Sequence, residues 1–483
     1  MTTTNTSSTT PSLDVFILTF NAAKQQINPS IFAHHLRNAF LQNAAELPEL
    51  VVFCLQEMAP LAHGFIGSYM ISPFFQTYAS AVNLAARSFV AGQNQQRDGA
   101  QDPNEPQDPP YTLVASRSVG MTGIMLFARD PKAVDNLQST EVSFGAGSMA
   151  NKGAVGLRLL YAKEDAGGQK RSTELTFVGA HLAAHEWNLE KRNRNWESLV
   201  TGLLFEDPGK LHNVKSLHPT PHAFDGNDEG EGLLSQEQND KALHDITIYK
   251  PGSHLFIAGD LNYRISKTSP SPSSVFPDPD PTSPNYFKHF LARDQLTLEK
   301  AAGRTLHGLT ESTILFPPTY KLDVADWDGV VPRKNGSPTI DASSWNWAPH
   351  RWPGWCDRVL YLDVPPWASD PAAKETRITT LAYDALPAVR TSDHRAVFLR
   401  LAVPVLEPSE LAPPNELRAA DSNDPRIKLP YPVDFQSWEH RAQVKKWEPM
   451  IGWSMLISQS KKGIALFIAL FLVGLGTWWL RSR

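Results

Sequence analysis

Residues 256–264 read Phe-Ile-Ala-Gly-Asp-Leu-Asn-Tyr-Arg, an apolar run that ends at a glycine and continues into polar side chains. Because successive side chains of an extended strand alternate between two faces, Asp260 and Asn262 are expected to point the same way and to face one ligand. A carboxylate and a carboxamide so placed can activate and orient a water molecule. A strand that simply ends in a polar turn is the alternative, and a single segment of this kind would favour it.

Other predicted strands carry polar clusters of the same type at one end. The short apolar runs 15–18, 51–54 and 175–178 each precede such a cluster, and the runs 359–362 and 396–399 each follow one. Six strand ends that present Asn, Glu, His or Asp are hard to attribute to chance, so we expect a shared site. The residues concerned, besides Asp260 and Asn262, are Asn21, Glu57, His181, Asp357, Asp393 and His394.

Helical patterns separate these strand-like runs. Between residues 31 and 43, Phe32, Leu36, Ala39 and Phe40 recur at helical spacing, and a second helical pattern covers 186–204. With 41% hydrophobic and 20% charged residues, the chain can bury a full core. The predicted fold class is therefore mixed α/β.

The polar segments resemble those of the inositol polyphosphate 5-phosphatases, which are part of the endonuclease/exonuclease/phosphatase superfamily. The resemblance covers residues 13–403, which we expect to form one catalytic domain, and it implies a two-sheet β-sandwich flanked by helices, with catalytic loops at one end of the sheets. The segments that carry it are Gly-Asp-Leu-Asn-Tyr-Arg at 259–264, Pro-Gly-Trp-Cys-Asp-Arg at 353–358, Gly-Ser-Met-Ala-Asn-Lys-Gly at 147–153 and Pro-Pro-Thr-Tyr-Lys at 317–321.

The resemblance implies Mg²⁺-dependent attack of water on a phosphomonoester. Glu57 is a hard oxygen ligand of the kind that Mg²⁺ prefers, and Asp393 is the expected second carboxylate on the metal side. Asp260 is the expected base for the attacking water, and Asn262 would hold the water or the phosphate. The remaining implied roles are Asn21 beside Glu57, His394 at the scissile phosphate, Asp357 orienting the imidazole of His394, and His181 stabilising charge in the transition state.

Substrate contacts are also implied by the resemblance. Tyr320, Lys321 and Arg351 would meet a 4-phosphate on an inositol ring, Asn151 and Lys152 a 1-phosphate, and Met149 the lipid chains. One departure affects this set, because Pro349 stands where the family usually has a lysine. Arg333 or Lys334 on the preceding loop is a candidate replacement.

Several conspicuous residues have a structural reading instead. His185 and Arg192 follow His181 on a predicted helix, where they can cap it or pair on its surface. Arg264 and Arg358 are equally open to two interpretations, as braces of loops through buried ion pairs or as ligand contacts.

Cys54 and Cys356, the two cysteines, lie in strand-like or motif segments and read as buried hydrophobes rather than as a disulfide. Neither begins a Cys-x5-Arg loop, since Pro60 and Leu362 occupy the arginine position. Thiolate phosphatase chemistry is thereby disfavoured, and a reducing compartment is expected.

The two ends of the chain have distinct compositions. Residues 1–12 are rich in Ser and Thr, and we expect them to be disordered and not to act as a signal peptide. Prolines recur in 404–437, which predicts an extended tether. Residues 438–462 combine tryptophans with lysine pairs and read as an amphipathic juxtamembrane segment.

The uncharged run 463–480 would form a helix roughly 27 Å long, enough for a thin bilayer. It predicts a transmembrane tail anchor, with a buried core helix as the alternative. The short span and the basic residues upstream favour the endoplasmic reticulum membrane with a cytosolic catalytic domain.

The predicted activity is Mg²⁺-dependent removal of the 5-phosphate from phosphatidylinositol 4,5-bisphosphate at a cytosolic membrane surface, giving phosphatidylinositol 4-phosphate. The net charge of −5 argues against a nucleic-acid partner. Two alternatives stay open: another phosphoesterase of the superfamily, such as a nuclease or a sphingomyelinase, and a noncatalytic membrane tether that only binds phosphoinositide.

Overall fold

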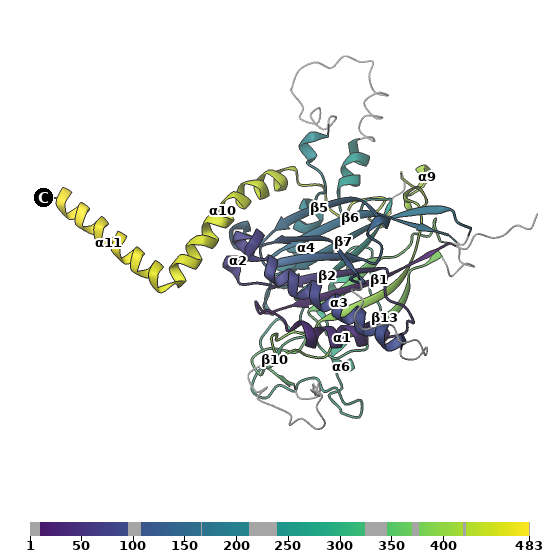
Figure 1. Ribbon diagram of the computed structural model, residues 1–483, viewed down its shortest axis with the longest axis horizontal. Helices are drawn as coiled ribbons and strands as arrows, with labels where there is room; N and C mark the ends of the chain where they lie inside the picture. The colour runs from purple at the N-terminus through teal and green to yellow at the C-terminus, as the bar shows by residue number, and fades with distance from the viewer. Residues whose placement is uncertain are drawn as a thin grey trace, which may run out of the picture.

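Two six-stranded sheets form the centre of the molecule (Figure 1). The computed structural model describes residues 10–94, 108–165, 167–211, 239–323, 345–369, 376–418 and 422–482. The first sheet has the strand order β13-β14-β1-β2-β4-β3, with β1 parallel to β2 and antiparallel to β14. Its strands are β1 (Ser12–Asn21), β2 (Leu50–Gln56), β3 (Thr112–Val119), β4 (Thr122–Ala128), β13 (Thr379–Ala385) and β14 (Val397–Pro404).

The second sheet has the order β5-β6-β7-β8-β12-β9, in which β7 and β8 are parallel and the other pairs antiparallel. Its strands are β5 (Val134–Ser143), β6 (Gly153–Glu164), β7 (Lys170–His181), β8 (Ser253–Asp260), β9 (Leu309–Thr310) and β12 (Asp357–Leu362). A small antiparallel pair, β10 (Leu322–Asp323) and β11 (Asn346–Trp347), lies apart from both sheets.

The sheets pack face to face over a continuous apolar layer. Every residue of β2, β4, β8 and β12 is buried, as expected for strands covered on both faces. Ile17 and Val52 of the first sheet share one core cluster with Phe177 and Val359 of the second. The polar ends of these strands are therefore held by a rigid double layer.

Helices cover the outer face of each sheet. Against the first sheet, Phe32 and Leu36 of α1 (Pro29–Leu41) and Tyr78 of α3 (Ser72–Asn94) cluster with Phe16 and Leu18. Against the second, Trp196 and Leu199 of α4 (Leu189–Gly202) and Leu296 of α7 (Gln295–Ala301) cluster with Val178 and Ile257. Other short helices of the domain include α2 (Leu61–Ile66), α6 (Lys288–Leu291), η1 (Ser68–Met70), η2 (Pro131–Ala133), η3 (Ala146–Ser148) and η4 (Pro208–Lys210).

This arrangement confirms the expected two-sheet sandwich flanked by helices. The helix predicted over 31–43 is α1, which begins earlier because the Asn28 side chain caps it by accepting hydrogen bonds from the backbone of Ser30 and Ile31. Of the expected disordered N-terminus, residues 1–9 lie outside the described part of the chain, whereas β1 already begins at Ser12.

The segment 404–437 differs from the expected extended tether. Its described part contains α8 (Pro408–Leu411) and α9 (Asn415–Arg418) and runs along the domain. Leu411 is buried, and its carbonyl oxygen accepts a hydrogen bond of 3.1 Å from Trp367 Nε1. Glu407 accepts one of 2.8 Å from the backbone of Ser172. The prolines shorten the helices here but leave apolar and acidic side chains free to anchor the segment.

Two long helices end the chain, α10 (Phe435–Gln459) and α11 (Lys461–Arg481), and they project from one side of the domain (Figure 1). Ser460 separates them and caps α11 by accepting a hydrogen bond from the backbone of Gly463. Among the described residues, no helix has the length and apolar character needed to cross a bilayer. The transmembrane span predicted over 463–480 is thus not supported.

Candidate active site

Polar strand ends of both sheets meet around Asp260. In the second sheet, Asp260 is paired with His181 across the parallel β7–β8 ladder and with Asp357 across the antiparallel β8–β12 ladder. From the first sheet, Asn21 Nδ2 donates a hydrogen bond of 2.9 Å to Asp260 Oδ2. The cluster therefore depends on the facing of the two sheets and on the register of three neighbouring strands.

Asp260 is buried, and each oxygen of its carboxylate has at least one partner. His181 Nε2 lies 3.4 Å from Asp260 Oδ2, and the backbone N–H of Asn262 donates to Oδ1 at 3.1 Å. Burial alone would raise the pKa of Asp260, but the hydrogen bond from His181 and the charge of His394 hold it well below its usual range. The carboxylate therefore stays ionised and can accept a hydrogen bond from a water molecule.

Asn262 is adjacent to Asp260, though not by strand alternation as predicted. The strand β8 ends at Asp260, and Asn262 adopts a left-handed conformation (φ 58°), which asparagine tolerates. Its Nδ2 donates to the carbonyl oxygen of Leu182 at 3.1 Å, and its Oδ1 accepts from Arg264. The turn, rather than the pleat, sets the direction of this side chain.

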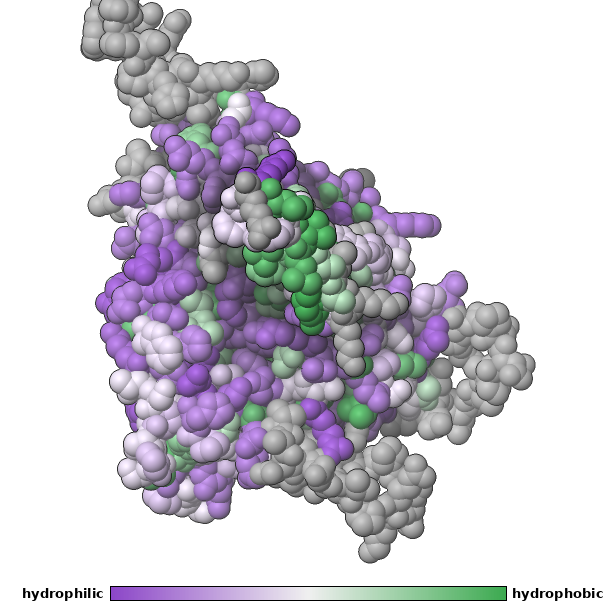
Figure 2. All heavy atoms as spheres, turned by 90° about the vertical axis from the view of Figure 1, so that its left-hand side faces the viewer, coloured by the Kyte–Doolittle hydropathy of each residue, from purple (hydrophilic) through white to green (hydrophobic). Residues whose placement is uncertain are grey.

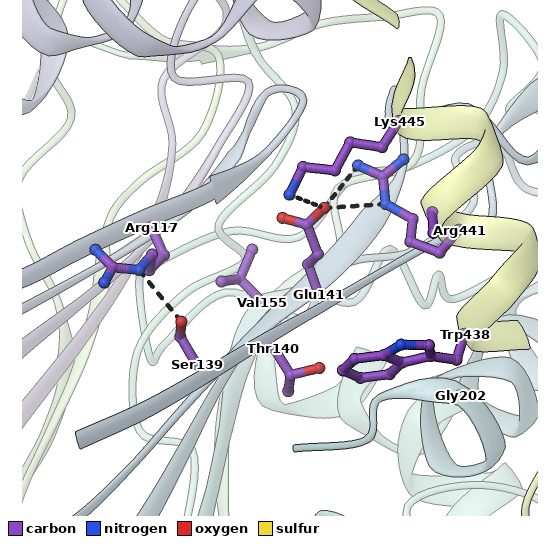
Figure 3. Close-up of a pocket in the computed structure, with 10 residues that line it drawn as sticks. Arg117, Ser139, Thr140, Glu141, Val155, Gly202, Trp438, Arg441 and Lys445 are labelled. Carbon is purple, nitrogen blue, oxygen red and sulfur yellow. Dashed lines mark hydrogen bonds and ion pairs between the residues drawn. The ribbon is translucent and has the colours of Figure 1, made fainter. Parts of the chain in front are cut away.

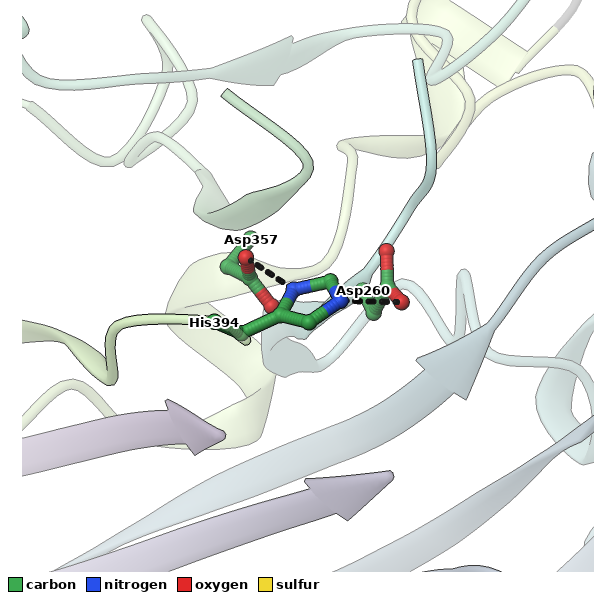
Figure 4. Close-up of side chains that lie close together, drawn as sticks. All are labelled: Asp260, Asp357 and His394. Carbon is green, nitrogen blue, oxygen red and sulfur yellow. Dashed lines mark hydrogen bonds and ion pairs between the residues drawn. The ribbon is translucent and has the colours of Figure 1, made fainter. Parts of the chain in front are cut away.

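His394 and Asp357 form a close buried pair beside Asp260 (Figure 4). His394 Nδ1 lies 2.9 Å from Asp357 Oδ2, and Nε2 lies 4.0 Å from Asp260 Oδ2. Burial would lower the pKa of His394, but the charge of Asp357 prevails and raises the pKa to about 9. At neutral pH the imidazole is therefore a cation that directs a proton toward each carboxylate.

Asp260, Asp357 and His394 also offer potential ligand atoms within 4.8 Å of one another. These atoms already have protein partners, however: His394 Nδ1 lies 2.9 Å from Asp357, and Asp260 is contacted by Asn21 and His181. The trio is better described as a carboxylate–imidazolium–carboxylate relay.

Glu57 is the carboxylate best suited to a divalent cation. It directly follows β2 in a left-handed conformation (φ 44°), and its side chain keeps 22% exposure. Burial would raise its pKa, but the charges of His181 and Lys152 lower it, and Lys24 Nζ lies 3.0 Å from Oε2. An ionised, accessible carboxylate, next in the chain to Gln56, which pairs with Asn21 across β1 and β2, fits the oxygen chemistry of Mg²⁺.

Asp393, expected as a second carboxylate on the metal side, forms an ion pair with Lys321. Its Oδ2 lies 2.5 Å from Lys321 Nζ, and both residues line a cavity of about 570 Å³ together with His350 and Arg390. In this arrangement Asp393 positions an ammonium group.

The structure also places the predicted substrate residues around the cluster. Lys152 Nζ contacts His181 and lies 3.8 Å from Glu57, and the ring of Tyr320 lies 4.5 Å from that of His394. Arg351 lies at the rim, with its Nη2 3.5 Å from Nδ1 of His185. Asn151 precedes Lys152 on the loop after η3, and Met149 packs against the core between the sheets.

Two hydroxyl groups that were not singled out from the sequence complete the site. Ser392 Oγ donates to the carbonyl oxygen of Asn21 at 2.5 Å and accepts from the backbone of His394 at 3.0 Å. Thr319 Oγ1 donates to Asp357 at 2.7 Å. Both residues lie inside polar segments that flank the predicted site, and that position was the available signal.

Arg358 and Arg264, whose roles the sequence leaves open, are buried and bond to other protein side chains. Arg358 is buried between Asp294, at 2.9 Å, and Glu311, at 2.6 Å. Arg264 is buried, contacts Asn262, and lies with its guanidinium 4.3 Å from the ring centroid of Tyr320. Arg264 thus supports Asn262 and Tyr320, and Arg358 fixes the strand end that carries Asp357. Arg192 is likewise buried, and it bonds to the backbone of Ala183 and to Gln295.

The chain is similar in sequence to known phosphatases. The chain is 28% identical over 286 residues to the type II inositol 1,4,5-trisphosphate 5-phosphatase of Mus musculus, covering 58% of this chain and 21% of that protein. It is 27% identical over 356 residues to the polyphosphatidylinositol phosphatase INP53 of Saccharomyces cerevisiae, covering 73% and 23%. The chain thus spans about a fifth of the length of these relatives.

A solved structure of the inositol polyphosphate 5-phosphatase domain of SPsynaptojanin, in complex with inositol (1,4)-bisphosphate and calcium ion, matches with a TM-score of 0.49 and 20% identity, over 89% of this chain and 91% of that one. The Endonuclease/Exonuclease/phosphatase family 2 matches residues 18–400, which is most of the chain and includes every residue of the cluster around Asp260. The chain belongs to that family.

Proposed function

We propose that this protein is a phosphoinositide 5-phosphatase that removes the 5-phosphate of phosphatidylinositol 4,5-bisphosphate and gives phosphatidylinositol 4-phosphate. The observation that carries the proposal is the buried contact of Asn21, His181 and the Asp357–His394 pair with Asp260. The names of the mouse and yeast relatives, a trisphosphate 5-phosphatase and a polyphosphatidylinositol phosphatase, support the substrate class.

The side chains divide the chemistry of phosphomonoester hydrolysis among them. Asp260, kept ionised, accepts a hydrogen bond from the attacking water and orients it, and Asn262 lies beside it. The cationic His394 offers a donor to the oxygens of the scissile phosphate, whose negative charge it offsets in the transition state, whereas Lys152 would meet the 1-phosphate. Mg²⁺, when bound by Glu57 and Asn21, would supply charge neutralisation at the phosphate and lower the pKa of water.

Substrate choice is proposed to depend on the basic side chains at the rim. Lys321, fixed by Asp393, and Arg351 would meet the 4-phosphate, with the hydroxyl of Tyr320 as a further donor. Pro349 removes one cation that the family usually has at this point. Arg333 and Lys334, the suggested replacements, lie outside the described residues. We therefore propose the 4,5-bisphosphate over more highly charged inositol phosphates.

The C-terminal helices support action at a lipid surface. Large apolar side chains of α11 are exposed, with Phe471 and Trp478 each at 67% and Leu480 at 70%. Figure 2 shows a hydrophobic patch on the face from which the C-terminal helices project. We propose that this helix contacts lipid and that the protein resides at the endoplasmic reticulum membrane, with the domain in the cytosol. Imaging the tagged full chain against a variant that ends at Ser460 tests the location.

The proposed activity is tested by phosphate release across a panel of phosphoinositides and soluble inositol phosphates, with and without Mg²⁺. Release of one phosphate from the 4,5-bisphosphate, with the 4-phosphate retained, is the expected result. Cleavage of abasic DNA or of sphingomyelin in place of phosphate release would favour a different phosphoesterase. Tight lipid binding without any turnover would favour a noncatalytic tether.

The pH profile is expected to depend on the Asp357–His394 pair. Because the folded-state pKa of His394 is raised to about 9 from 6.5, a step that needs the imidazolium proceeds at neutral pH and is lost as pH rises through about 9. In Asp357→Asn the principal charge that raises this pKa is gone, so the alkaline loss of kcat/KM should move toward neutral pH. An unmoved alkaline limb would show that another group governs it.

Glu57→Gln is expected to raise the Mg²⁺ concentration needed for half-maximal activity by at least about tenfold, because a neutral amide is a weaker ligand for a hard dication. Glu46→Gln provides the control, since the Glu46 side chain is 84% exposed on the surface. Mg²⁺ titrations of the three proteins measure the difference. Equal Mg²⁺ requirements in all three would place the metal elsewhere.

A further inference from the structure

Helix α10 carries one buried carboxylate among exposed side chains. Trp447 and Met450 are each 61% exposed, whereas Glu448 between them is only 4% exposed. The helix lies against α2, and the contact is close at Gly452, where a Cβ atom would come within 2.8 Å of the carbonyl oxygen of Ala62. Burying a carboxylate is costly unless it is paired and hydrogen-bonded, so its partners identify what it does.

Arg441, earlier on the same face of the helix, is the first partner. Its Nη1 and Nη2 lie 2.8 and 2.9 Å from the two carboxylate oxygens of Glu448, a bidentate pair. Arg441 is in turn held by Glu141 of β5, which also pairs with Lys445 at 3.0 Å (Figure 3). Two carboxylates thus balance two cations at this junction, and the geometry of Glu448 is fixed.

The second partner lies on the loop that carries the predicted lipid and phosphate contacts. Glu448 Oε1 accepts a hydrogen bond of 2.9 Å from the backbone N–H of Ala150, 298 positions away in the chain. Ala150 has no exposed surface, and its carbonyl oxygen presses on Gly120, where a Cβ atom would lie 1.8 Å away. The backbone at Ala150 is therefore wedged between Gly120 and Glu448.

Ala150 is two residues before Lys152, which contacts residues of the candidate active site. The loop is closed by hydrogen bonds from Phe144 N to Lys152 O and from Gly145 N to Met149 O, both 3.1 Å, so that it moves as a unit. At its end Lys152 reaches His181 and Glu57. Fixing Ala150 consequently fixes where the Lys152 ammonium and the Met149 side chain lie.

We propose that Glu448, oriented by Arg441, is a positioning residue for the substrate loop 145–152, so that α10 forms part of the substrate-binding wall. The inference rests on the proposed function for the identity of the substrate. It assigns to the C-terminal region a direct part in substrate binding, through one backbone hydrogen bond. Loss of that bond should displace Lys152 and weaken binding more than it slows the chemical step.

The test compares Glu448→Ala and Glu448→Gln in the full-length protein with Glu439→Ala, which changes an exposed carboxylate of the same helix. Amide hydrogen exchange over 144–152 and the separate kcat and KM for phosphatidylinositol 4,5-bisphosphate in mixed vesicles are measured. For Glu448→Ala we expect faster exchange in this loop and a KM raised about tenfold, with kcat within about twofold. Glu448→Gln keeps an oxygen that can accept from Ala150 and should recover part of both effects, while Glu439→Ala should match the wild type.

The proposal is overturned if the loop of Glu448→Ala exchanges as slowly as that of the wild type, or if kcat falls while KM is unchanged. Should Glu448→Ala not fold, Arg441→Lys, which keeps the charge but breaks the bidentate pair, is judged by the same two criteria. If the wild type releases no phosphate from the lipid, the proposed function fails, but hydrogen exchange still decides the positioning role.

Discussion

Asp260→Asn is expected to lower the rate of phosphate release by about 10²–10⁴-fold, the usual contribution of a positioned acid–base group. The substitution preserves size but removes the negative charge that His181 and His394 surround. A neutral amide cannot accept a proton from the attacking water. Its NH2 group could also face the Nδ2 donor of Asn21, which now donates to the carboxylate. Phosphate release from phosphatidylinositol 4,5-bisphosphate, measured at saturating Mg²⁺, gives the ratio.

Asp280→Asn is the matched control for this experiment. Asp280 lies on an exposed loop, and in the described contacts its side chain bonds to Thr282, two residues on, so the activity should not change. Circular dichroism of both variants checks that the sandwich is intact. If Asp260→Asn kept more than a tenth of the wild-type rate, Asp260 would not be the group that handles the water.

Arg358→Met is expected to have the largest effect on stability, about 3–5 kcal/mol, because removing one member of a buried ion cluster leaves its partners as uncompensated charges. The Arg358 side chain is 1% exposed, and its guanidinium holds both Asp294 and Glu311. Asp294 also caps α7 by accepting from the backbone of Thr297. Urea unfolding followed by tryptophan fluorescence measures the loss.

Arg87→Met, an exposed position on α3, should leave the unfolding midpoint close to that of the wild type. Arg358 is next to Asp357 in the chain. Arg358→Met should therefore lose part of its activity as well as its stability. A variant that unfolds like the wild type but loses activity would instead place Arg358 at the substrate, which is the interpretation that the buried ion cluster disfavours.

The strand ends were predictable from the sequence because a short apolar run bounded by polar residues is typical of a buried strand. The runs at 51–54 and 359–362 lie within β2 and β12, and Asn21, His181, Asp260 and His394 are indeed close together. The partner that each polar side chain contacts within the site was harder to predict. Asp393 pairs with Lys321 because the turn before β14 directs it there, and sequence spacing does not encode that turn.

The C-terminal region shows a different limit of prediction. Prolines in 404–437 indicated a free tether, yet the segment packs along the domain because Leu411 and Glu407 find partners on distant strands and loops. Nothing in the sequence indicated that Glu448 would be buried. A single acidic residue in a helix rich in Trp and Lys reads as solvated, and only the fold shows that it reaches a backbone amide on another loop.

The row of Asp357, Asp260 and His181 across β12, β8 and β7 has a consequence for the evolution of the chain. Side chains alternate between faces, so a slip of one position in either ladder would turn a member of the row toward the opposite layer while leaving the same number of backbone bonds. Insertions can therefore accumulate in the connecting loops, where they cost little. A single residue gained or lost within β8 would instead break up the row, and it would also put a side chain at the place of Gly259, where a Cβ atom would lie 2.0 Å from the carbonyl oxygen of Ala180.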